Sequence, residues 1–137
     1  MPRAKLAPPI PSVRPSMPRA GSNVVVVRGT VADEPQQRAV ASGSVFEATV
    51  ITRSVVDGVT VREPVPVVWS DPRLSCSAGA EVMVRGRVRQ RFFRSGPATV
   101  SRTEVIAEEI VLASRRPATA KLVDRAVHGI HELGGST

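Results

Sequence analysis

The sequence predicts an all-β domain of five short strands, preceded by an irregular basic segment and followed by one amphipathic helix. Three observations carry this prediction. The apolar residues make up 42% of the 137 positions and are mostly Val and Ala, and a supply of β-branched residues favours strands. They occur in short runs separated by Gly, Pro, Asn, Asp and Ser, which is typical of strands joined by turns. The chain length fits one domain with a modest core.

Residues 1–22 are expected to form a disordered basic arm. The segment contains six prolines and four basic residues but no acidic residue. Proline fixes φ and lacks an amide donor, so prolines at this density prevent a helix or a central strand. Non-specific contact with phosphates is one role open to such an arm, and a simple flexible leader is another.

Between residues 23 and 112 the pattern predicts the five strands. Gly29 interrupts the first of them, as happens where a strand bends sharply or another backbone comes close. Asp57-Gly58 between two β-branched runs predicts a hairpin turn. Pro64 and Pro66 remove two donors from one edge of the third strand, so that edge should be unpaired or bulged. The expected strands are 23–31, 45–53, 59–69, 82–94 and 102–112.

Two segments after the third strand favour a helix, and the core of the expected fifth strand, E-V-I-A-E-E over residues 104–109, could also be helical by propensity. Segment 70–79 could form a single turn around Arg73 and Leu74. Residues 113–137 predict a linker and then an amphipathic helix, because apolar residues recur there at helical spacing. This helix, over about residues 119–133, could fold back onto the barrel, bind a protein partner or be only marginally stable. The apolar positions are Leu122, Val123, Ala126, Val127, Ile130 and Leu133.

The net charge of +7 is unevenly distributed along the chain. Residues 23–112 hold eleven arginines against ten acidic residues, so the predicted barrel is close to neutral. Five of these arginines lie between Arg85 and Arg94. The basic character of the barrel is therefore local, which indicates a polyanionic partner more strongly than a high pI alone.

The fourth expected strand separates its residues into two faces. Because side chains alternate along a strand, Val82, Val84, Gly86 and Val88 share one face while arginines occupy the other. The arginine face leads into two phenylalanines, which are flat surfaces for stacking bases. The pattern indicates a nucleic acid, although an Arg-rich edge that only prevents aggregation is the alternative. The arginines of this face are Arg85, Arg87, Arg89 and Arg91, followed by Phe92 and Phe93.

Several classes of function have no support in the sequence. Cys76 is the only cysteine, so an internal disulfide and a thiolate metal cluster are excluded. His128 and His131 have no third ligand nearby, and no nucleophile, paired-acid or phosphate-loop motif is evident. No apolar run is long enough to span a membrane, and the N-terminal residues lack the apolar core expected of a secretion signal. We expect a cytoplasmic binding protein that is not an enzyme and needs no cofactor or metal.

The order of the five strands, with a small insertion after the third, matches an OB-fold barrel. Within that order, several motifs resemble those of the bacterial single-stranded DNA-binding proteins over residues 23 to 112. The first strand resembles the family's Asn, alternating aliphatics and Gly, and later segments resemble its third, fourth and fifth strands. The residues that carry the resemblance are Asn23, Val25, Val27, Gly29, Glu34-Pro35, Arg38, Ser42-Gly43, Val67-Val68-Trp69, Val84, Gly86, Arg89, Arg91, Phe93 and Arg102-Thr103-Glu104-Val105.

The resemblance implies sequence-independent binding of single-stranded DNA in replication, repair or recombination, by a nucleoid-associated homo-oligomer that is usually a tetramer. Arginines would contact phosphates and aromatic rings would stack on bases. Phe92, which alternation places on the apolar face of its strand, and Phe46 are assigned to the core. The candidate binding residues are Arg38, Trp69, Arg85, Arg87, Arg89, Arg91, Phe93 and Arg94.

The sequence departs from the family where Glu63 and Val55-Val56 replace aromatic residues, and the family's acidic tail is not found. Because this chain has fewer aromatic rings, we expect it to bind more weakly, and with a steeper dependence on salt, than a family member that has all of them. Two alternatives stay open: binding of RNA or structured DNA on the same barrel, and a protein-interaction module that has lost its stacking residues.

Overall fold

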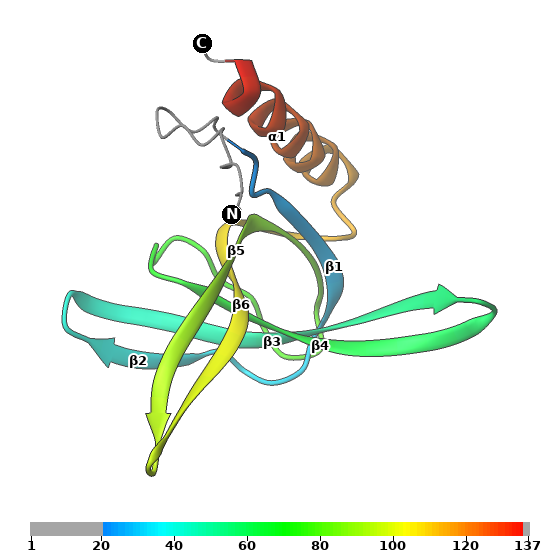
Figure 1. Ribbon diagram of the computed structural model, residues 1–137. Helices are drawn as coiled ribbons and strands as arrows, with labels where there is room; N and C mark the ends of the chain where they lie inside the picture. Colours follow the sequence, from blue (N-terminus) through cyan, green and yellow to red (C-terminus); the bar gives the residue numbers. More distant parts are fainter. Residues whose placement is uncertain (1–20, 136–137) are drawn as a thin grey trace, which may run out of the picture.

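The computed structural model describes residues 21–135, so the expected basic arm lies almost entirely outside the described residues. Six strands and one helix follow one another along the chain (Figure 1). The elements are β1 (Val25–Val31), β2 (Gln36–Val40), β3 (Gly43–Val56), β4 (Val59–Trp69), β5 (Glu81–Ser95), β6 (Ala98–Leu112) and α1 (Arg116–Gly135).

Five of the strands close into a barrel in the order β1-β5-β6-β4-β3, and β3 pairs back with β1. The closing contact is short, joining Thr30 to Ile51 and Val31 to Val50. Strands β4 and β6 run parallel, whereas all other neighbours are antiparallel. The predicted OB-fold barrel is confirmed.

Several elements differ from the sequence prediction, and β3 and β6 are longer than the expected 45–53 and 102–112. Strand β2 is not predicted, because its polar residues follow Pro35 and resemble a turn; it pairs with β3 at the margin of the barrel. The single helical turn expected near Leu74 is wrong, since that segment contains only hydrogen-bonded turns. Helix α1 begins at Arg116 and ends at Gly135, so it is longer than the expected 119–133.

Valine side chains fill the interior of the barrel together with Trp69. Gly29 permits this packing, because a Cβ at that position would lie 2.2 Å from the carbonyl oxygen of Ile51. The close approach of a second backbone at Gly29 is thus confirmed. The Asp57-Gly58 hairpin is confirmed as well, with φ values of 51° and 79° that suit a tight turn of two residues.

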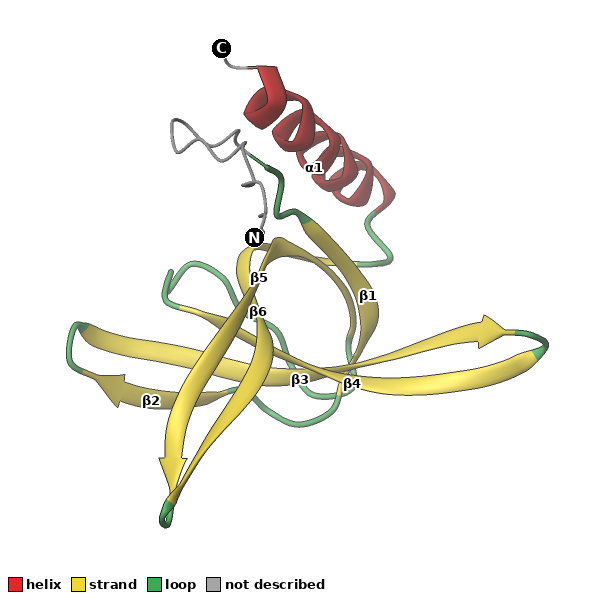
Figure 2. Cartoon of the chain, viewed as in Figure 1, coloured by secondary structure: helices red, strands yellow, loops and turns green. Residues whose placement is uncertain are grey.

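The β3–β4 and β5–β6 hairpins extend beyond the barrel as two long arms (Figure 2). Both faces of such an arm meet solvent, so alternation along the strand no longer separates core from surface. Phe92 lies on the β5–β6 arm and is 65% exposed. Its expected place in the core is therefore wrong. On the β4 arm, the ladder with β3 continues through Pro64 and Pro66, while β6 pairs with β4 only at Val67 and Val68. The expected unpaired edge at the prolines is confirmed.

Helix α1 packs against β1, β5 and β6 through one face. Leu122 is fully buried and Ala126 nearly so, which shows that the helix folds back onto the barrel. Val123, Val127 and Ile130 remain exposed on the helix. Within residues 21–135, no helix is both apolar and long enough to cross a membrane.

Cys76 lies half buried beside the core, and this burial, with the nearby Glu34 carboxylate, raises the pKa of its thiol. Because the thiolate is the reactive form, we expect slower alkylation by iodoacetamide at about pH 8.5 than in the urea-unfolded chain. The folded state holds the proton more tightly, so folding stability should fall as pH rises through the range where the unfolded thiol ionises. Mass spectrometry at several pH values measures the alkylation rate of Cys76. Equal rates in the folded and unfolded chains would contradict the raised pKa.

Candidate nucleic-acid interface

The outer face of the β5–β6 hairpin carries the predicted row of arginines. The two strands pair antiparallel around a two-residue turn at positions 96–97. On the inner face, Val82, Val84 and Gly86 are buried, whereas Arg87 and Arg89 on the outer face are exposed. The predicted alternation is confirmed where β5 forms part of the barrel.

Glu104 on β6 holds two of these arginines in place. Its side chain is fully buried, and its carboxylate accepts hydrogen bonds from Arg89 Nη2 at 2.6 Å and from Arg91 Nε at 3.4 Å. A buried carboxylate needs such partners, because an unpaired charge away from water is strongly destabilising. One carboxylate between two guanidiniums leaves a net positive charge at this point of the hairpin.

Phe93 lies at the outer end of the same face. The Arg91 guanidinium carbon is 4.8 Å from the centre of the Phe93 ring, which is a cation–π distance. Phe93 is 37% exposed, so part of its surface is open to a ligand. Because Arg91 covers one face of the ring, a stacking base would meet the other face.

At the opposite end of the row, Arg85 is neutralised. Strand β6 contains one extra residue opposite Arg85 and Gly86, a β-bulge that brings two consecutive acids to one arginine. Arg85 donates to Glu108 at 2.8 Å and to Glu109 at 3.0 Å. Its side chain is mostly covered. The structure therefore removes Arg85 from the set of free cations, since its charge is already paired twice.

The remaining predicted cations fall into two groups. Arg38 pairs with Glu47 at 3.3 Å on the neighbouring β2–β3 ladder, so its charge is also compensated. Arg87 and Arg94 are exposed, and neither forms an ion pair with an acid of the described chain. The free positive charge on β5 thus comes from Arg87, Arg94 and the Arg89–Arg91 pair, and Arg102 on β6 is also without an ion pair in the described chain.

The prediction that Trp69 belongs to the binding site is wrong. Its side chain is 2% exposed, and its ring stacks on Phe46 with centroids 5.9 Å apart. Its indole nitrogen donates to the carbonyl oxygen of Leu74 at 3.1 Å. A base cannot stack on a ring enclosed in this way, so Trp69 is a core residue. The assignment of Phe46 to core packing is confirmed.

Two residues at this surface have no role predicted from the sequence. Glu104 anchors the arginines, and counting outward from the turn at 96–97 places it opposite Arg89, so the hairpin register could have identified it. Arg102 lies opposite Arg91 and lines a cavity of about 140 Å³ together with Glu34 and Glu47. This cavity joins the β5–β6 hairpin to the β2–β3 ladder, and only the closed barrel brings those segments together.

The architecture is similar to that of solved single-stranded DNA-binding proteins. A Plasmodium falciparum single-stranded DNA-binding protein, solved in complex with single-stranded DNA, superimposes with a TM-score of 0.61. The alignment covers 70% of this chain and 98% of that one, at 18% sequence identity. The chain shares its fold with that protein.

A small single-stranded DNA-binding protein from Streptomyces coelicolor is also similar, with 20% identity and a TM-score of 0.49 over 68% of this chain and 95% of that one. No family model matches the sequence, and no curated protein matches it either. The similarity of fold is therefore recognised from the structure and not from a sequence match.

Proposed function

We propose that this chain binds single-stranded DNA without sequence preference through the outer face of the β5–β6 hairpin. The observation that carries the proposal is the placement of Arg89 and Arg91, held by one buried carboxylate beside the exposed ring of Phe93. Cations held at fixed positions can meet phosphates with little loss of conformational entropy. The ring offers a surface on which any base can stack, worth roughly 1 to 3 kcal/mol.

The chemistry of this face suits a single strand. A flexible single strand exposes phosphates and base planes together, whereas a duplex hides its base planes. Guanidiniums and a phenyl ring recognise phosphates and π-faces, so they read no particular base. The fold shared with a protein solved in complex with single-stranded DNA supports the same conclusion.

We further propose that the chain acts in DNA replication, repair or recombination in the cytoplasm, at the nucleoid, as a binding protein and not as an enzyme. The binding function is placed in residues 23–112. The C-terminal helix is the segment proposed to meet a protein partner, which the exposed Val123, Val127 and Ile130 support.

A homo-oligomer, with the tetramer as the expected form, belongs to the same proposal. The edge of β1 that faces away from β5 pairs with β3 only at Thr30 and Val31 within the described chain. The backbone of Val25 to Gly29 is therefore free on that edge to pair with another copy, and an unpaired edge favours such pairing. Multi-angle light scattering measures the assembly.

The binding test removes the arginine pair together with its anchor. In the triple variant R89Q/R91Q/E104Q no buried charge is left unpaired, so the fold should survive. We expect the affinity for fluorescently labelled oligo-dT at low salt to fall about tenfold or more. We also expect the slope of log K against log salt, which is negative, to become shallower by about 1.4, because each lost phosphate contact with a single strand accounts for about 0.7. Fluorescence anisotropy at several salt concentrations measures both.

The matched control is R53Q/R73Q, which removes two exposed arginines from outside β5, β6 and α1. It lowers the net charge by two, whereas the triple variant lowers it by one. If the control weakens binding as much as the triple variant, binding depends on overall charge and the proposed surface is wrong. Competition by oligo-U and by duplex DNA in the same titration distinguishes the RNA alternative, and no binding to any of the three would favour a protein-interaction module.

A further inference from the structure

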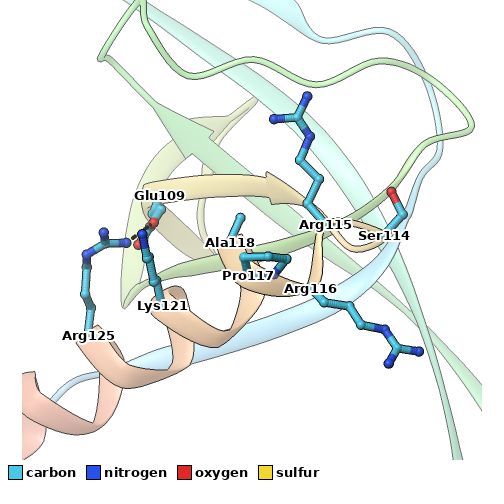
Figure 3. A pocket seen from close by; sticks show the side chains of 8 residues that line it. All are labelled: Glu109, Ser114, Arg115, Arg116, Pro117, Ala118, Lys121 and Arg125. Carbon is cyan, nitrogen blue, oxygen red and sulfur yellow. Dashed lines mark hydrogen bonds and ion pairs between the residues drawn. The ribbon is translucent and has the colours of Figure 1, made fainter.

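A large cationic cavity lies between the end of β6 and the first half of α1 (Figure 3). Its volume is about 680 Å³. It is outside the arginine row of β5, and the proposed binding surface does not include it. Its lining residues are Glu109, Ser114, Arg115, Arg116, Pro117, Ala118, Lys121 and Arg125.

The charges of this cavity are poorly balanced. Glu109 is its one acidic side chain, and this carboxylate already accepts hydrogen bonds from Arg85 and Arg125. Within residues 21–135, Arg115, Arg116 and Lys121 form no ion pair, and all three are exposed. Figure 3 shows Arg115 and Arg116 extending away from Glu109, on the side of the cavity opposite Arg125.

Arg115, directly before α1, and Arg116, its first residue, do not stabilise the start of this helix. The first turn of α1 contains no acidic residue, although negative side chains are the favourable ones at that end of a helix. Basic residues there repel one another and the helix end. Basic residues at this end of a helix are unfavourable for stability, and no ion pair compensates Arg115 or Arg116 within residues 21–135. A cluster of this kind indicates a role in binding.

The cavity continues the cationic row of β5. Arg87 is the exposed cation of β5 on the side of α1, and it lines a neighbouring cavity of about 510 Å³ together with Arg125. Arg125 belongs to both cavities and is paired with Glu109, and Glu108 also lines the second cavity, so the unpaired cations Arg87 and Lys121 lie on either side of this charged pair. From Arg87 to Arg91 the strand rises about 14 Å, and from Arg116 to Arg125 the helix rises a further 14 Å or so.

We propose that the cavity at α1 is a second phosphate-binding surface, which receives the backbone of a single strand of nucleic acid after it leaves the arginine face of β5. This inference rests on the proposed function and extends it from the barrel to the helix. Several cations spaced along one helix suit an extended polyanion better than a single small anion. The cavity offers no aromatic ring, so it should bind phosphates without stacking bases.

The test compares two oligo-dT lengths in the full chain. An oligonucleotide of about 4 residues, the lower end of the range that one OB barrel occupies, covers the arginine row alone, and one of about 24 also reaches the helix. In R115Q/R116Q/K121Q we expect the affinity for the longer strand to fall about fivefold to tenfold at low salt, with a salt slope smaller by about 2. The affinity for the shorter strand should not change. The R53Q/R73Q control should leave the difference between the two lengths intact.

A footprint on the wild-type chain gives an independent readout. Lys121 and Lys5 are the two lysines of the sequence. Acetylation of Lys121 should slow severalfold in the presence of the longer strand and stay unchanged with the shorter one. If the wild type binds both strands while the helix variant binds the longer one equally well, or Lys121 is not protected, this inference is overturned and the proposed function stands. Failure of the wild type to bind either strand overturns both.

Discussion

Replacing Gly86 with alanine is expected to destabilise the fold by about 3 kcal/mol or more, because the barrel has no room for the added methyl group. A Cβ at Gly86 would lie 2.0 Å from the carbonyl oxygen of Ile106 and 3.1 Å from the Cα of Ala107. These are backbone atoms, which cannot rotate away as a side chain can. Relief would require β5 and β6 to separate at the bulge. Thermal unfolding followed by circular dichroism should show a melting temperature lower by about 10 to 20 °C.

Gly129 provides the matched control within the same chain. It lies in α1, where an added Cβ would have Val24 Cγ2 at 3.9 Å as its nearest neighbour, an ordinary contact. Alanine favours a helix by roughly 0.5 to 1 kcal/mol over glycine, so G129A should raise the melting temperature. The two substitutions add the same methyl group and should shift stability in opposite directions. A G86A protein with the same melting temperature as the wild type would contradict the predicted clash.

At the bulge beside Gly86, part of the structure could be predicted from the sequence and part could not. Alternation correctly places Gly86 on the inner face of β5, together with Val82 and Val84. The extra residue in β6 has no signal of its own in the sequence, because Glu108 and Glu109 read equally well as ordinary strand positions. For that reason the pairing of Arg85 with both acids could not be predicted, and the sequence pattern alone leaves Arg85 among the free cations.

Trp69 and Phe92 are wrongly assigned for a different physical reason. Trp69 ends a strand that contains Pro64 and Pro66, so its side could not be assigned by counting along the strand, and only the closed barrel places it against Phe46. The core assignment of Phe92 depends on counting along β5, which succeeds inside the barrel and fails on the projecting arm. Periodicity identifies the face of a strand, whereas burial depends on what covers that face.

The charge of Glu104 has two expected consequences that separate stability from binding. In E104Q the amide keeps the shape of the side chain and can still accept a hydrogen bond from Arg89, but two guanidiniums lose their shared counter-charge. We expect a loss of about 2 kcal/mol in the free energy of unfolding. This is less than the roughly 3 to 5 kcal/mol of a fully buried pair, because Arg89 and Arg91 are partly exposed and water can solvate them. Urea unfolding measures this loss.

The same substitution should strengthen binding if Arg89 and Arg91 contact phosphates. With Glu104 neutral, the two guanidiniums face the DNA without an opposing charge, so the affinity for oligo-dT at low salt should rise about threefold and the gain should fade as salt screens the charges. R89Q/R91Q/E104Q shares the E104Q change and should bind about tenfold more weakly than wild type. Opposite effects from two variants that both lack Glu104 would assign the phosphate contacts to the arginines themselves. If folded E104Q binds more weakly, Glu104 acts mainly by positioning the guanidiniums, and charge neutralisation by Glu104 does not limit the affinity for DNA.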